Sequence, residues 1–140
     1  MVKNHILDTS ALLAYLQSED GSKTIEEILM TARRSNHVYI SFITLMELYY
    51  IIWQEEGEHK AREILTLLKS LPIQVVESNH RITLTAGRLK ANHKLSVADA
   101  FIAATAIEKE AVLVHKDPEL ESIKKYIEIL TLPYKKSSSH

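Results

Sequence analysis

The chain has 140 residues, of which 46% are hydrophobic and 25% charged, a composition typical of one globular domain and unlike that of a disordered or fibrous chain. Its 17 basic and 18 acidic residues almost cancel, so bulk charge does not indicate nucleic-acid binding, and any basic surface must be local. There are no cysteines, which excludes disulfides, thiolate metal sites and cysteine nucleophiles.

The N-terminal part of the chain alternates short apolar runs with helical patterns. A strand is predicted over residues 4–7, and Asp8 follows it directly. Helical spacing continues in TSALLAYLQ (9–17) and, after the turn signal EDGS, in the amphipathic KTIEEILMTARR (23–34). The run HVYIS (37–41) is predicted to be the second strand.

The next segment, FITLMELYYIIW (42–53), is too long for a typical strand and is predicted to be a helix. It is apolar on nearly every side, so it is either deeply buried or partly covered by a second subunit. Glu47 is the only formally charged residue between Ser35 and Gln54, and its helical neighbours supply no cation. Because a lone carboxylate in an apolar setting is costly, Glu47 must be protonated, paired with a distant cation or bound to a metal ion.

The second half of the chain continues the alternation. Helices are predicted over 57–71, 78–93 and 96–110, and strands over 73–77, 111–115 and 126–132. Strands separated by helices throughout indicate a parallel sheet covered on both faces. We therefore expect a single three-layer α/β/α domain over residues 1–134, with a central parallel sheet of about five strands. The last residues, KKSSSH (135–140), are expected to form a flexible, solvated tail.

Three aspartates stand at positions that are also typical of helix caps. Asp8 precedes the first helix, Asp99 has the spacing of a capping box, and Asp117 precedes a proline, so each of them alone could be a helix cap. In an open parallel sheet, however, ligands gather at the carboxyl ends of the strands. Asp8 and Asp117 follow strands there, and Glu47 and Asp99 lie in helices near the same edge.

Four carboxylates in one place repel one another unless a divalent cation joins them. All-oxygen ligation suits Mg²⁺ or Mn²⁺, which keep several waters and commonly engage phosphates. The pattern therefore predicts a hard-metal site.

At these residues the sequence resembles the PIN-domain ribonucleases, and specifically the small VapC-type toxins of toxin–antitoxin pairs. The blocks ILDTSALLAYL, SFITLMEL, LSVADAFIAATA and LVHKDPEL occur in the family's order and span nearly the whole chain. The second block carries the Ser-x-x-Thr-x-x-Glu pattern through Ser41, Thr44 and Glu47.

The resemblance implies that the acidic set forms the catalytic metal site for Mg²⁺ or Mn²⁺: Asp8, Glu47, Asp99 and Asp117. Ser10, or Thr9 beside it, would support metal or water near Asp8, and Ser41 and Thr44 belong to the supporting residues. The last block departs from the pattern, because His115 stands where the family usually has Thr, and Leu120 where it usually has Phe. His115 could hydrogen-bond the site, add a metal-binding nitrogen or simply pack.

The implied activity is endonucleolytic cleavage of RNA that leaves a 5′-phosphate and a 3′-hydroxyl, carried out by the toxin of a toxin–antitoxin pair. The implied partners are a VapB-like antitoxin and a second copy of the chain in a homodimer. Candidate contacts to RNA phosphates are Arg33, Arg34, Lys90, Lys94 and Lys116.

Three other functions are alternatives to this one. A haloacid-dehalogenase-type phosphatase needs Asp-x-Asp after the first strand, where this chain has Ser10 instead, and the paired acids of a receiver domain are not clear. A catalytically weak PIN scaffold that acts as a binding or regulatory module remains an alternative function.

No apolar run reaches the ~18–20 residues of a membrane span, and MVKNHILD lacks the apolar region of a signal peptide, so we expect a cytoplasmic protein without a membrane partner.

Overall fold

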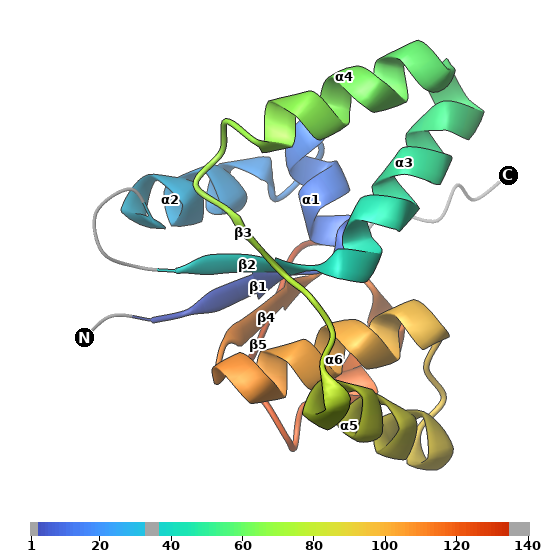
Figure 1. Cartoon of the computed structure of the whole chain (residues 1–140). Helices are drawn as coiled ribbons and strands as arrows, with labels where there is room; N and C mark the ends of the chain where they lie inside the picture. Colours follow the sequence, from blue (N-terminus) through green and yellow to red (C-terminus); the bar gives the residue numbers. More distant parts are fainter. Residues whose placement is uncertain (1–2, 33–36, 135–140) are drawn as a thin grey trace, which may run out of the picture.

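The computed structural model of the chain describes residues 3–32 and 37–134. Its centre is a five-stranded sheet in the order β3-β2-β1-β4-β5, in which every neighbouring pair is parallel (Figure 1). The strands are β1 (His5–Leu7), β2 (Val38–Ser41), β3 (Gln74–Val76), β4 (Val112–His115) and β5 (Ile129–Thr131). The predicted five-stranded parallel sheet is therefore confirmed.

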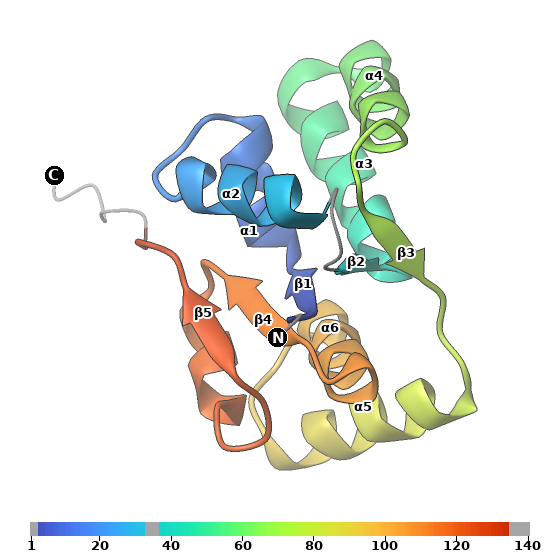
Figure 2. The same cartoon turned by 90° about the vertical axis from the view of Figure 1, so that its left-hand side faces the viewer.

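Helices cover both faces of the sheet, as expected for strands joined by helical crossovers. They are α1 (Thr9–Leu16), α2 (Ser22–Ala32), α3 (Phe42–Glu56), α4 (Glu58–Leu68), α5 (His80–Asn92) and α6 (Val97–Lys109). A 3₁₀ helix, η1 (Pro118–Ile123), follows β4. Figures 1 and 2 show α1 and α2 on one face, α5 and α6 on the other, and the α3–α4 hairpin extending away from the sheet.

The core has two halves because successive strand residues point to opposite faces. Ile6 of β1 and Leu113 of β4 pack with α5, α6 and η1. Their neighbours Leu7 and Val114 pack with α1, α2 and residues of α3 and α4. The sheet is thus the middle layer of the three-layer α/β/α domain that the sequence predicts.

A single glycine separates α3 from α4. Gly57 has φ +95°, in the left-handed region that favours glycine, and its N–H donates to the carbonyl of Trp53 at the end of α3. The hairpin therefore turns at the residue where the predicted helices 42–53 and 57–71 meet.

The largest differences between the predicted and the observed elements are at four places. The helix predicted over 42–53 extends to Glu56, and the helix predicted to reach residue 71 ends at Leu68. The strand predicted over 126–132 is limited to Ile129–Thr131, and η1 was not predicted. The predicted tail 135–140 lies outside the described residues. Within the described ranges, no helix combines the length and apolar character needed to cross a membrane.

Candidate metal centre

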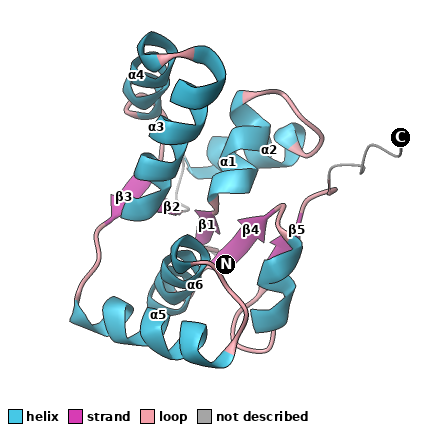
Figure 3. Ribbon diagram, turned by 90° about the vertical axis from the view of Figure 1, so that its right-hand side faces the viewer, coloured by secondary structure: helices cyan, strands magenta, loops and turns pink. Residues whose placement is uncertain are grey.

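The carboxyl ends of the adjacent strands β2, β1 and β4 lie side by side at one edge of the sheet, across the strand ends. This edge faces the viewer in Figure 3. β1 lies between β2 and β4, and Leu7 is in register with Val114. The N–H of Asp8 donates to the carbonyl of Val114 at 3.0 Å. This pairing places the residue that follows β1 beside the segment that follows β4.

Asp8 begins α1 and is only 2% exposed. Its Oδ1 accepts the N–H of Ala11 at 2.7 Å, and the Ser10 hydroxyl lies 2.8 and 2.7 Å from its two carboxylate oxygens. Burial raises the pKa of Asp8 to about 7, helped by the negative charges of Asp117 and Glu47, although the Ala11 and Ser10 hydrogen bonds oppose this rise. The predicted helix cap is confirmed, and the same carboxylate also faces other acids.

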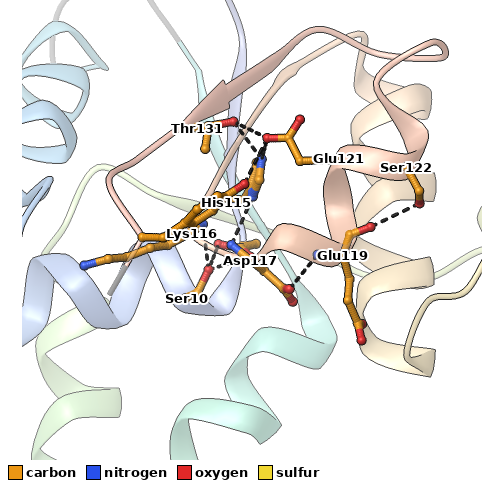
Figure 4. A network of polar contacts seen from close by, with 10 residues as sticks. Ser10, His115, Lys116, Asp117, Glu119, Glu121, Ser122 and Thr131 are labelled. Carbon is orange, nitrogen blue, oxygen red and sulfur yellow. Dashed lines mark hydrogen bonds and ion pairs between the residues drawn. The ribbon is translucent and has the colours of Figure 1, made fainter. Parts of the chain in front are cut away.

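Ser10 links Asp8 to the segment after β4. Besides donating to Asp8, its hydroxyl oxygen accepts the N–H of Lys116 at 2.9 Å (Figure 4). The Lys116 side chain is 4% exposed, and its Nζ reaches Glu19 at 3.4 Å and the carbonyl of Asp20 at 3.0 Å. Lys116, a predicted phosphate contact, is therefore held against the α1–α2 turn.

Asp99 lies in the first turn of α6. Ser96 caps this helix, because its Oγ accepts the N–H of Asp99 at 3.1 Å. Burial raises the pKa of Asp99 to about 8, and its hydrogen bond to Asp117 and the charges of Asp117, Asp8 and Glu47 act in the same direction. Asp99 is therefore within electrostatic reach of the other three predicted acids.

Glu47 is held from α1 across the interface with α3. The Thr9 hydroxyl donates to Glu47 Oε1 at 2.5 Å and lies 3.2 Å from the Thr44 hydroxyl. Among the ion pairs of the described residues none includes Glu47, so the alternative of a long-range salt bridge is not found there. Ser41 caps α3, where its Oγ accepts the N–H of Ile43 at 3.3 Å, and so fixes the start of the helix that carries Glu47.

Asp117 begins η1 in the manner expected of Asp followed by Pro. Its Oδ1 accepts the N–H of Glu119 at 3.0 Å. Asp99, Asp117 and Glu119 each offer a carboxylate oxygen, and these three atoms all lie within 4.8 Å of one another.

The sequence reasoning missed Glu119. Its position two residues after Asp117 is the signal that could have identified it. An acid in the first turn of a helix also has a purely structural explanation, because it suits the helix N-terminus.

His115 is completely buried at the end of β4. Its Nδ1 accepts the N–H of Asp117 at 3.0 Å, and its Nε2 lies 3.1 Å from the Thr131 hydroxyl and 3.6 Å from Glu121 (Figure 4). Burial lowers its pKa, against the opposing negative charges of Glu121 and Asp117. Because both ring nitrogens have partners, hydrogen bonding is the role that the structure shows, and neither nitrogen is free for a metal.

The other predicted phosphate contacts lie in different settings. The Nζ of Lys90 donates to the carbonyl of Leu95 at 2.9 Å, and Lys94 is exposed on the loop between α5 and α6. Arg33 and Arg34 lie outside the described residues.

The donor set fits a hard divalent cation. It consists of carboxylate oxygens, three of them close enough to share one ion, and burial and mutual repulsion disfavour the charged forms of Asp8 and Asp99. A bound divalent cation would offset that repulsion.

Comparison with known proteins identifies a family with this fold. The family model described as PIN domain matches residues 5–126. None of the curated protein sequences shows significant similarity to the chain.

Three solved structures of similar fold come from bacterial complexes. VapBC2 from Rickettsia felis bound to a DNA fragment from their promoter is 21% identical, with a TM-score of 0.72 over 93% of this chain and 99% of that one. DNA-bound VapBC from Salmonella typhimurium is 22% identical, with a TM-score of 0.73 over 94% and 98%. VapBC-1 from nontypeable Haemophilus influenzae is 22% identical, with a TM-score of 0.74 over 91% and 97%.

Proposed function

The chain belongs to the PIN-domain family of nucleases, and we propose that it is a divalent-metal-dependent endoribonuclease, the toxin of a toxin–antitoxin pair. The observation that carries the proposal is the position of Asp99, Asp117 and Glu119, whose carboxylate oxygens lie within 4.8 Å of one another beside Asp8 and Glu47. Such a group of acids at the carboxyl edge of a parallel sheet is suited to hold Mg²⁺ or Mn²⁺ against a phosphate.

The acids differ in their surroundings, and we infer a different role for each group. Asp99, Asp117 and Glu119 would hold the ion directly, whereas the buried Asp8, oriented by Ser10 and Ala11, would close the site from the side of α1. Glu47, held by the Thr9 hydroxyl, would complete the set from α3. Since the pKa values of Asp8 and Asp99 are raised to about 7 and about 8, metal binding near neutral pH would release protons from this pair.

The proposed reaction is hydrolysis of an RNA phosphodiester bond. Water attacks phosphorus, the bond from phosphorus to the 3′-oxygen breaks, and the products are a 5′-phosphate and a 3′-hydroxyl. A divalent ion held by Asp99, Asp117 and Glu119 would supply an activated water and charge relief on the phosphoryl oxygens. An ionised carboxylate of the set can accept the proton that the attacking water loses. Lys94, exposed on the α5–α6 loop, is the candidate cation for a neighbouring phosphate.

Two partners are proposed as well. The similar structures named above are VapBC complexes, which supports a VapB-like antitoxin for this chain. The outer side of α3 exposes Met46, Tyr50 and Trp53 at helical spacing, which supports a homodimer formed through this helix. We propose that the toxin and its antitoxin act in the cytoplasm.

The test is RNA cleavage by the purified protein with Mg²⁺, with Mn²⁺ and with EDTA. Asp8→Asn is the site variant, and Glu27→Gln, an exposed acid on α2, is the matched control. We expect cleavage that requires the metal and Asp8 and that the control retains. If RNA stays intact and neither ion raises the melting temperature, the enzyme proposal is wrong, and the scaffold would then be a binding module.

A further inference from the structure

His115 connects the candidate metal centre to the last strand of the sheet. Its imidazole is completely buried, lies between the Asp117 backbone and β5, and contacts the Thr131 side chain (Figure 4). A buried imidazole without partners would cost free energy, and an aliphatic side chain could fill the space, so its hydrogen bonds need an explanation.

The hydrogen bonds around His115 can run in only one direction. The Asp117 N–H must donate, so Nδ1 is the unprotonated nitrogen and the neutral ring carries its proton on Nε2. Nε2–H then donates to the Thr131 hydroxyl, which in turn donates to Glu121 Oε1 at 2.8 Å. Tyr134 donates to the same Glu121 oxygen at 3.0 Å. Every donor has an acceptor, and a fully satisfied network of this kind holds its members rigidly.

The bond to Asp117 spans two residues, like the turn in which an Asn or Asp side chain accepts the N–H two positions ahead. It fixes the backbone of Asp117 before the chain enters η1. The Asp117 carboxylate then accepts the backbone N–H of Glu119, so the backbone position that carries the second carboxylate depends on the first.

We propose that His115 is the positioning residue of the metal centre, holding Asp117 and Glu119 in a geometry that can bind a divalent cation. This inference rests on the proposed function. His115 acts through Asp117 and touches neither the ion nor the RNA. Removing such an outer contact typically weakens metal binding or activity by about 10–100-fold.

Three substitutions separate positioning from packing. His115→Asn places a carbonyl oxygen near the position of Nδ1, so it can still accept the Asp117 N–H. His115→Gln places its amide near Nε2 and keeps only the side towards Thr131. His115→Leu fills much of the space and keeps neither bond.

The readouts are Mn²⁺ affinity by electron paramagnetic resonance, kcat and KM for RNA cleavage, and melting temperature in EDTA. We expect His115→Leu and His115→Gln to bind Mn²⁺ about tenfold more weakly or worse and to lose kcat more than KM. His115→Asn should stay close to wild type in Mn²⁺ affinity. Melting temperatures should not follow this order, because Asn fills less of the buried space than Leu or Gln.

Equal Mn²⁺ affinity in the Gln variant and wild type would overturn the inference, as would losses that only follow the melting temperatures. If a His115 variant does not fold, Thr131→Val removes the second link of the network, and we expect a smaller loss of Mn²⁺ affinity from it.

A spectroscopic measurement on the wild type tests the bond itself, without metal or RNA. The nitrogen–nitrogen scalar coupling between the Asp117 amide and His115 Nδ1 should be detectable by NMR, and its absence would contradict the inference. Failure of the proposed function would look different, because wild-type protein would then neither bind Mn²⁺ nor cleave RNA.

Discussion

Asp8 caps α1 and is also positioned for the role in the metal centre that we propose for it, two roles that the sequence presents as alternatives. One carboxylate oxygen accepts a helix N–H at the start of α1, and the buried group also faces Asp117 and Glu47. A cap and a metal ligand are compatible because a carboxylate has two oxygens and about four lone-pair directions. The position of Asp8 after a strand was predictable from the sequence, but the contact of its second oxygen with the Ser10 hydroxyl was not.

Burial of Asp8 and Asp99 predicts that the metal-free protein loses stability as pH rises, which is the reverse of ordinary acid denaturation. Asp8 and Asp99 have pKa values of about 7 and about 8 in the folded chain, against an ordinary value of 3.8. The folded state therefore binds more protons than the unfolded state between these values, and its stability falls as pH rises from about 4 to about 8. Thermal unfolding in EDTA at pH 5 and pH 8 measures this effect.

Asp8→Asn removes one of these charges while Asn still caps the helix. At pH 8 in EDTA we expect the variant to be more stable than wild type by about 1–3 kcal/mol, and to gain little from Mn²⁺. Glu27→Gln, on the exposed side of α2, should change neither quantity. Equal wild-type stability at both pH values would contradict the explanation.

Glu119 gives a sharper test of the donor set, because this residue lies near two of the predicted acids and is exposed. Glu119→Gln should lower Mn²⁺ affinity severalfold with little loss of melting temperature, because no core packing changes. Calorimetric titration with Mn²⁺ beside Glu27→Gln is the measurement. Unchanged affinity would assign the ion to the other carboxylates.

The starts of the helices determine which side chains lie at the carboxyl ends of the strands. The boundaries of α1, α5 and α6 follow the sequence closely, because a capping residue, Asp8, Asn79 or Ser96, stands immediately before each. β5 was predicted too long, since Tyr126 belongs instead to the turn after η1, where its N–H donates to the carbonyl of Ile123. A short 3₁₀ helix has no hydrophobic period of its own, so only its cap, Asp117, was visible beforehand.

The link between α1 and α3 is predicted to matter for stability and for the site. Thr9→Val removes the hydroxyl that donates to Glu47 and leaves that half-buried carboxylate without its donor. We expect a loss of about 1–3 kcal/mol in unfolding free energy and weaker Mn²⁺ binding. Thr66→Val, on the exposed side of α4, makes the same chemical change and should be nearly neutral in urea unfolding. A loss as large in the control would show that the hydroxyl bond is not the cause.

At the scale of the whole molecule, the near-neutral composition hides a concentrated acidic edge. The parallel topology was predictable because strands and helices alternate along the chain, and parallel strands end at one edge. How α3 divides its surface was not predictable, since the helix is apolar on nearly every side. The structure places Leu48 and Ile52 in the core, and Tyr49 beside α4, where its hydroxyl donates to Glu58.

What remains of α3 is an outward stripe, with Met46, Tyr50 and Trp53 exposed by 54%, 43% and 45%. Aromatic residues and Met are enriched at the centres of protein interfaces, where charged residues are depleted. Tyr50→Glu should therefore convert a dimer to a monomer by placing a charge at the middle of the stripe. Light scattering after size exclusion measures the mass.

Met30→Glu on α2 is the matched control, because Met30 is 61% exposed and lies on a different helix. It should leave the mass of a dimer unchanged, and both variants should keep the wild-type melting temperature at low protein concentration. A wild-type monomer, or dissociation by both substitutions alike, would contradict dimerisation through α3. Dissociation by Tyr50→Glu alone would place this interface on the helix that carries Glu47, so that assembly and the metal centre share one element.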